Sequence, residues 1–152
     1  MGKAAKQVVT YCIRNDIGTL IVGYNTTFQR SSDLGRQMNQ VFVGIPFGIL
    51  RRKLKYLCEM NGIRYVEQEE SYTSMASFWD LDEMPVYGEA GLVPPVFSGR
   101  RICRGLYQDR SGRRINADVN GALNIMRKCN IVSLRALYDR GDVDTPVRIR
   151  IA

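Results

Sequence analysis

A carboxylate stands at the start of a predicted helix near the C-terminal end of the chain. From Asp118 onward, apolar residues recur at helical spacing, at Val119, Ala122, Leu123 and Met126. Asp118 therefore lies in or beside the first helical turn. An acid there is either an N-cap or first-turn residue that interacts favourably with the helix dipole, or a ligand for a hard cation such as magnesium. Local chemistry favours the first interpretation, because caps are far commoner than ligands.

Two further acids follow a predicted strand in the middle of the chain. Residues 63–67 form a short strand pattern, and Glu69 and Glu70 come directly after it. Ligands of open α/β sheets gather at the carboxyl ends of parallel strands, so this pair is a plausible place for a metal. The alternative is that one or both are solvated loop acids.

The elements that must position these acids are predicted from apolar spacing and from helix signals. Residues 3–15 place Ala4, Ala5, Val8, Val9, Cys12 and Ile13 on one stripe of an amphipathic helix. Residues 19–24 are a nearly continuous apolar run, typical of a strand covered on both faces, and a polar loop follows over 25–39. Pro46 and Gly62 bracket a second helix, which makes strand, helix and strand 63–67 a βαβ unit with parallel strands.

The second half of the chain is less regular before the last helix. Residues 75–98 contain several Pro and Gly residues and predict an extended surface loop or insertion. A strand over 101–107 and a turn over 108–112 then lead to the helix of Asp118. Residues 130–152 carry four arginines beyond that helix and predict a partly ordered tail.

Composition limits the classes of protein and of site. With 152 residues, 45% of them hydrophobic, the chain is expected to form one globular domain, and its net charge of +7 suits a polyanionic partner. No apolar run approaches a membrane span, so a cytoplasmic protein without membrane contact is expected. Histidine is absent and none of the four cysteines forms a C-x-x-C pair, which argues against structural zinc and leaves the cysteines as unpaired residues.

Four segments together resemble the TnpB family of transposon-encoded RNA-guided nucleases. They are residues 16–25, 39–46, 68–78 and 115–125, and the last contains Asn-Ala-Asp-Val-Asn-Gly-Ala-Leu-Asn-Ile. The resemblance implies an α/β fold: a truncated RNase H-like (RuvC-type) domain with a mixed sheet, flanking helices and its first strands missing. Residues 1–129 would be the C-terminal portion of that domain, with 75–98 in place of a zinc ribbon, and 130–152 a basic tail. Zinc-bearing relatives have paired cysteines where this chain has residues 75–80.

The same resemblance implies a set of magnesium-binding acids, which hold two ions in RuvC-type chemistry. Asp118 matches the third acid of that set. The second acid usually closes an apolar strand, where this chain reads Val-Gly-Tyr-Asn over 22–25, so Glu70 or Glu69 would have to replace it, with Glu70 the first choice. The first acid lies in a strand that precedes this chain, and Asp16 falls at a helix end rather than within a strand. We expect Asp118 and the 69–70 pair to share a cation.

The expected function is that of a TnpB-type DNA-binding nuclease fragment, unable to cleave DNA by itself, whose full-length relatives also bind a guide RNA. One alternative is a nucleic-acid-binding module without catalysis, and another is a non-functional remnant with an exposed sheet edge. The module would contact phosphates through seven arginines: Arg51, Arg52, Arg100, Arg101, Arg104, Arg113 and Arg114.

Overall fold

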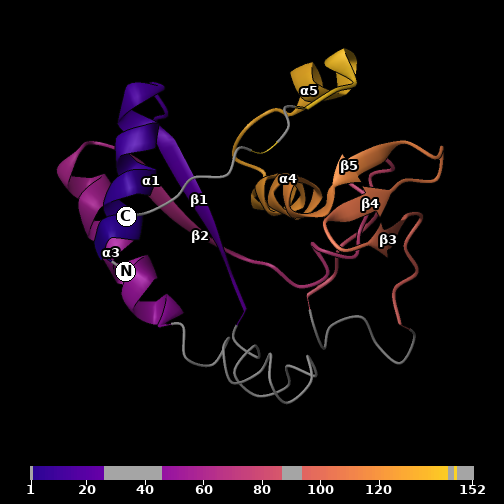
Figure 1. Ribbon diagram of the computed structural model, residues 1–152, viewed down its shortest axis with the longest axis horizontal. Helices are drawn as coiled ribbons and strands as arrows, with labels where there is room; N and C mark the ends of the chain where they lie inside the picture. The colour runs from indigo at the N-terminus through magenta and orange to yellow at the C-terminus, as the bar shows by residue number, and fades with distance from the viewer. Residues whose placement is uncertain (1, 26–45, 87–93, 144–145, 147–152) are drawn as a thin grey trace. The chain divides into compact units, whose positions relative to one another are not determined.

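The structure is a computed structural model that describes residues 2–25, 46–86, 94–143 and 146 (Figure 1). The chain divides into two units, Met1–Glu67 with Ile149–Ala152 and Gln68–Arg148. The division falls within a strand in the middle of the chain, so each unit is described by itself. The assignment of 1–129 to one portion of a nuclease domain and of 130–152 to a tail stays a prediction.

The first unit contains the predicted βαβ arrangement preceded by a helix. Its elements are α1 (Gly2–Arg14), β1 (Thr19–Tyr24), α3 (Phe47–Met60) and β2 (Arg64–Glu69), of which β2 ends in the second unit. The N–H of Arg64 donates to the carbonyl of Gly18 at 2.9 Å, so the two strands start side by side and run parallel. Pro46 is the N-cap of α3, and Gly62 follows its end with a φ of +67°, which confirms both helix signals.

The core of this unit lies between α1 and α3. Its buried residues are Ala5, Val9, Cys12, Leu54, Cys58 and Ile63. Val8 and Ile13 are 39% and 53% exposed, so the predicted apolar stripe of α1 was too wide. Every residue of β1 is only half-buried, and the expectation that it is covered on both faces was therefore wrong. Burial raises the pKa of the Cys12 and Cys58 thiols, which keeps them protonated and unreactive.

The second unit is built on a small antiparallel sheet. Its strands β3 (Arg100–Cys103), β4 (Leu106–Gln108) and β5 (Arg114–Asn116) lie in the order β3-β4-β5. The single strand predicted over 101–107 is in fact a hairpin, because Gly105 takes a φ of +79° and turns the chain between β3 and β4. Tyr107 and Ile115 pair across β4 and β5 and face the core.

Two helices complete the second unit, α4 (Ala117–Cys129) and α5 (Arg135–Arg140). The core contains Phe78, Tyr107, Ile115, Ala117 and Leu123, and it is flanked by Trp79, Val119, Leu134, Leu137, Tyr138 and Val143. Residues 134–143 are thus part of the packed unit, so this part of the predicted tail is ordered. Arg148 and Arg150 lie outside the described residues.

The observed architecture is a mixed α/β arrangement of a parallel pair, an antiparallel sheet and flanking helices. Residues 75–86 and 94–98 contain no helix or strand, as predicted, but Ala76, Ser77 and Phe78 are fully buried, so this part of the segment is not a surface loop. Most of the loop predicted over 25–39 lies outside the described residues. In the described part of the chain no helix is both long and apolar enough to cross a membrane.

Candidate nucleic-acid interface and acidic residues

Asp118 lies in the first turn of α4, and another residue caps the helix. The N-cap is Asn116, whose side-chain oxygen accepts hydrogen bonds from the N–H of Asp118 at 2.9 Å and of Val119 at 3.1 Å. Asp118 is exposed, and its carboxylate has no hydrogen-bond or ion-pair partner among the residues that the structure describes. The acid is therefore a first-turn residue favourable with the helix dipole, and its carboxylate is not used for capping.

Two buried asparagines fasten residues 73–78 along α4. Asn120 donates to the carbonyl of Ala76 at 2.9 Å and accepts from the N–H of Phe78 at 3.1 Å. Asn124, one turn later, donates to the carbonyls of Thr73 at 3.0 Å and Ala76 at 2.8 Å. The segment thus runs antiparallel to the helix, with Phe78 toward its start and Thr73 toward its end.

Glu69 is held at the C-terminal end of α4. The ammonium nitrogen of Lys128 lies 2.5 Å from one carboxylate oxygen of Glu69, and the N–H of Ser71 donates to the other at 2.5 Å. Burial alone would raise the pKa of Glu69, but the hydrogen bonds from Lys128 and Ser71 outweigh it and lower the pKa. Glu69 is therefore a charged, paired residue of the packed unit and not a solvated loop acid.

The structure does not bring Asp118 and Glu69 together. Lys128 lies ten residues after Asp118 in the same helix, which corresponds to about 15 Å along the axis. Glu70 directly follows Glu69 and accepts through its carbonyl from Thr73, so it lies on the same stretch of chain. Ligands of one magnesium ion each lie about 2.1 Å from it, so Glu69 and Asp118 in these positions do not share an ion.

The acids also form no larger array. In residues 2–25, 46–86, 94–143 and 146, no group of three or more His, Cys, Asp or Glu residues is placed to hold a metal ion. We therefore derive no chemical step through a metal from the described residues. The roles of Asp118 and Glu70 as magnesium ligands stay predictions.

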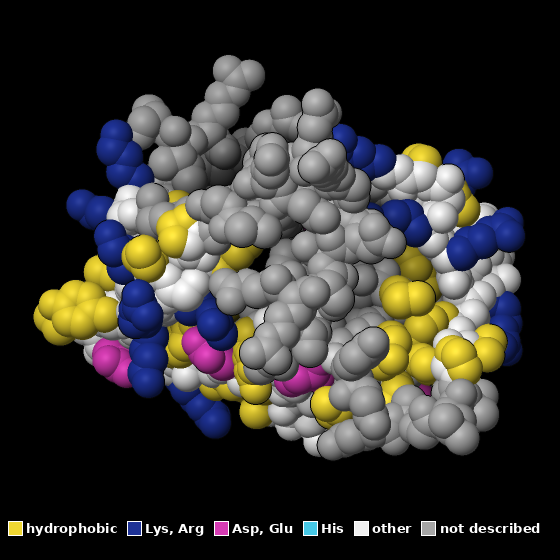
Figure 2. Space-filling view, turned by 90° about the horizontal axis from the view of Figure 1, so that it is seen from below, with side chains coloured by type: hydrophobic (Ala, Val, Ile, Leu, Met, Phe, Trp, Pro, Cys, Tyr) yellow, Lys and Arg dark blue, Asp and Glu magenta, His cyan; other side chains and the backbone are white. Residues whose placement is uncertain are grey.

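Several exposed arginines of the second unit lie on the β3-β4-β5 sheet and on the turn between β3 and β4. Arg100 pairs in register with Gln108, and Gln108 pairs with Arg114, so these three side chains form one row across the face opposite the core. With neighbouring strands about 4.8 Å apart, the two arginines stand about 10 Å from each other. Arg101 and Arg104 are also exposed on β3 and its turn. Lys and Arg side chains are seen over this unit at the right of Figure 2.

The seven predicted phosphate-binding arginines are not equivalent. Arg100, Arg101, Arg104 and Arg114 have no ion pair within the described ranges, and so present free guanidinium groups. By contrast, Arg51 lies 3.4 Å from Glu67 and over the ring of Tyr24. Arg52 is exposed on α3, in the other unit.

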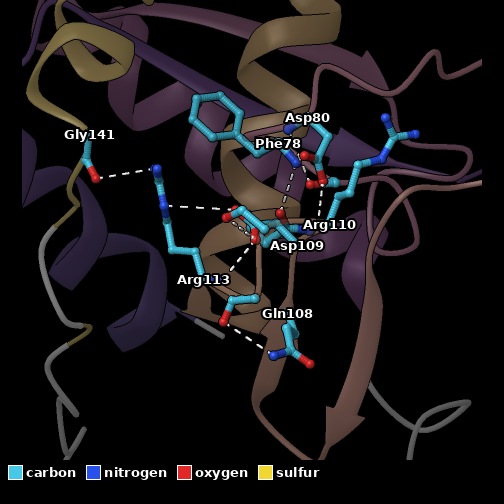
Figure 3. Close-up of polar contacts among 11 residues, drawn as sticks. Phe78, Asp80, Gln108, Asp109, Arg110, Arg113 and Gly141 are labelled. Carbon is cyan, nitrogen blue, oxygen red and sulfur yellow. Dashed lines mark hydrogen bonds and ion pairs between the residues drawn. The ribbon is translucent and has the colours of Figure 1, made fainter.

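Arg113 is fixed by contacts on several sides (Figure 3). Its guanidinium carbon lies 4.6 Å from the centroid of the Trp79 ring, its Nη1 donates to the carbonyl of Gly141 at 3.3 Å, and its Nε lies 3.8 Å from Asp109. The side chain is nevertheless 46% exposed. Arg113 is therefore a rigid, planar group with one part still open to solvent.

Two aspartates stabilise the turn between β4 and β5, which contains Arg110 and Arg113. The sequence analysis did not identify this role. Asp109 is buried and accepts from the N–H of Arg113 and the hydroxyl of Ser111, both at 2.8 Å, which closes the β4–β5 turn. Asp80 accepts from the N–H of Arg110 at 2.9 Å and joins the same turn to residues 77–82 (Figure 3). The signal available in the sequence was the Asp-Arg-Ser-Gly stretch, because Asp in a tight turn commonly accepts backbone N–H groups.

The comparison with protein families finds one similarity. The sequence model of a family described as Cas12f1-like, TNB domain matches residues 47–125, just over half of the chain. That range contains the two candidate acids Glu69 and Glu70, the whole β3-β4-β5 sheet and most of α4. No curated protein matches the chain.

Proposed function

Because the chain belongs to the Cas12f1-like TNB domain family, a domain of TnpB and Cas12-type nucleases with nucleic-acid partners, we propose that it is the DNA-binding part of a TnpB-type nuclease and does not cleave DNA by itself. The proposal includes the RuvC-type, RNase H-like assignment, which rests on the resemblance of the sequence motifs. It also includes the guide RNA as the partner of longer relatives.

The row of Arg100 and Arg114 carries the proposal. Both side chains are exposed on one face of a rigid sheet, in register, and both lack a carboxylate partner in the described part of the chain. A guanidinium group donates several hydrogen bonds in a planar fork that fits a phosphate, so unpaired arginines at fixed spacing suit a nucleic-acid backbone. Contacts of this kind position the protein but do not read base sequence.

Salt-dependent DNA binding tests the proposal. Arg100→Gln/Arg114→Gln should weaken binding of a labelled duplex and reduce the slope of log affinity against log salt by about 1.8, since each phosphate contact contributes about 0.9 for duplex DNA. Arg135→Gln/Arg140→Gln removes the same charge from α5, where Arg135 pairs with Asp139 and Arg140 bonds to the carbonyl of Asp142. An equal loss of slope in both double variants would show that only net charge matters, and would overturn the proposed surface.

Absence of cleavage by this chain is supported by the placement of the acids. Glu69 is ion-paired with Lys128 at the end of α4 opposite to Asp118, so the expected shared site is not assembled by these two residues. We therefore expect no nicking of supercoiled plasmid with magnesium present, in an assay in which DNA binding is measured in parallel. Nicking by the wild-type chain would overturn this part of the proposal.

A second candidate function, a carboxylate contribution to a nuclease centre, is favoured by one observation. Asn116 satisfies the N–H groups at the start of α4, so Asp118 is exposed without being needed as the cap. If the chain does nick DNA, Asp118→Asn should abolish nicking and leave folding unchanged, whereas Asp139→Asn, another exposed helical acid, should not. Equal activity in all three proteins would exclude Asp118 from the chemistry.

A further inference from the structure

We propose that a hollow beside the outer edge of β5 binds one unstacked nucleotide of a single-stranded nucleic acid. The inference rests on the proposed nucleic-acid binding and adds a specific subsite to it. The hollow lies wholly within the second unit and has a volume of about 550 Å³. That is within the range of cavities that hold a small ligand.

The walls of the hollow come from two parts of the chain. One wall is the edge of β5, from Arg113 to Asn116, and the other is formed by residues 141–143 with Pro146. Trp79, Leu106 and Val119 also line it. Apolar side chains and the ring of Trp79 thus line a space bordered by two arginines on one wall and by Asp142 on the other. An aromatic ring beside two arginines suits a flat base attached to a charged phosphate.

The edge of β5 offers unpaired backbone groups to this space. The backbone N–H of Asp109 donates to the carbonyl of Arg113, and the backbone N–H of Ala117 donates to the carbonyl of Gly105. Because backbone groups alternate in direction along a strand, those of residues 113, 115 and 117 point toward β4. The N–H and carbonyl of Arg114 therefore point the other way, along the outer edge of the sheet. In the described part of the chain no strand pairs with that edge. A donor and an acceptor at peptide spacing match the hydrogen-bonding edge of a base.

Three side chains add the remaining chemistry. The guanidinium plane of Arg113 is locked over Trp79 and is partly exposed, and bases stack on such planes. Arg114 is free to meet the phosphate. The side-chain oxygen of Asn116 is used in capping, but its amide nitrogen has no partner among the described residues and can donate.

A single-stranded ligand fits this arrangement better than a duplex does. The bases of a duplex are stacked and paired, so only an unstacked base presents both its face and its hydrogen-bonding edge to a pocket. An extended acidic peptide is the competing occupant, because it would pair with the β5 edge and neutralise the arginines. The short edge, three residues long, offers such a peptide few ladder bonds.

Fluorescence of Trp79 tests the inference, because it is the only tryptophan in the sequence. Oligothymidylate should change the Trp79 emission and should bind roughly tenfold more tightly than a duplex of equal length, as expected when one base stacks. Val143→Phe fills the hollow without removing any arginine. It should abolish the emission change and the preference for the single strand, and it should keep salt-dependent duplex binding.

The outcomes separate this inference from the proposed function. Duplex binding with the expected salt slope, but no preference for oligothymidylate and no emission change, would overturn the subsite alone, whereas failure to bind either DNA would overturn the proposed function as well. Displacement of oligothymidylate from the hollow by polyglutamate, but not by a duplex, would assign the edge to a peptide instead. If Val143→Phe does not fold, as judged by circular dichroism, Arg113→Lys keeps the charge but removes the stacking plane, and should lose the preference for the single strand.

Discussion

The ammonium group of Lys128 lies 2.5 Å from the carboxylate of Glu69, joining the last turn of α4 to the end of β2 across 59 positions of sequence. Lys128 also donates to the carbonyl of Ser71 at 3.2 Å. Glu69, which the sequence analysis gave as a candidate metal ligand, is thus ion-paired with a lysine of the same chain.

Lys128→Met should destabilise the protein by about 1.5–3 kcal/mol at pH 7, because a hydrogen bond between charged, partly buried groups is lost. Since the pKa of Glu69 is lower in the folded than in the unfolded chain, the stabilisation is complete above the ordinary glutamate pKa and is lost as the pH falls through the folded value. Urea denaturation between pH 7 and pH 3 should therefore show the wild type and Lys128→Met converging in acid. A difference that stays constant over this range would contradict the assignment. Arg135→Gln, which breaks an exposed pair, is the control.

Asn120→Ala should cost about 1–3 kcal/mol of the free energy of unfolding. The substitution leaves the buried N–H of Phe78 without its acceptor and removes the bond to Ala76. Asn15→Ala, which removes an exposed bond to Tyr11, should change stability much less. Equal effects of the two substitutions in urea denaturation would show that the buried asparagines do not hold residues 73–78 on α4.

Tyr138→Ala should destabilise the second unit by about 1.5–3 kcal/mol, because the ring of Tyr138 stacks on that of Phe78 with centroids 4.8 Å apart. Tyr138→Phe keeps the stack and loses only the hydroxyl bond to the Phe78 carbonyl, so it should cost about 1 kcal/mol. Thermal unfolding of the two variants measures both effects. Unchanged thermal unfolding of Tyr138→Ala would show that this ring does not hold α5 against Phe78.

Gly99→Ala should cost about 1–3 kcal/mol through overpacking. A methyl group there would lie 2.6 Å from the carbonyl oxygen of Gln108 and 2.6 Å from the ring of Tyr107, and neither backbone nor buried ring moves easily. Gly48→Ala is the matched control, since a methyl group on this residue of α3 meets nothing within 4 Å, and it should stabilise by up to about 1 kcal/mol. Hydrogen exchange at the β3–β4 hairpin would show whether the loss is local.

Local sequence signals were enough to predict the long helices. Pro46 and Gly62 bracket α3, and the apolar spacing after Asp118 identifies α4, because these features act within a few residues. The hairpin of β3 and β4 was missed because it depends on one glycine, Gly105, within an otherwise strand-like run. The six-residue helix α5 has no side-chain cap and was not predicted from the sequence. It packs through Tyr138 against Phe78 and Trp79, which are distant in the sequence.

The candidate site was only partly predictable for the same reason. Exposed arginines on a short strand can be recognised from composition and spacing, and Arg100 and Arg114 were among those predicted. Which arginines are already engaged cannot be recognised in this way, because Arg113 meets Trp79 and Gly141, which are 34 and 28 positions away in the sequence. Likewise, the separation of Asp118 from Glu69 is set by the direction of residues 73–78 along α4 and not by any local pattern.

The open margin of β5 also bears on how the protein behaves in concentrated solution. An unpaired edge strand can pair with a strand of another chain, and natural proteins prevent this by keeping such strands short and by placing charged residues on them. Here the margin is three residues long, begins at Arg114 and is preceded by Arg113, so copies of the chain repel one another at that place. A polyanion that covers these positive charges removes the repulsion, and self-association should then rise when the protein is in excess over its ligand at low ionic strength.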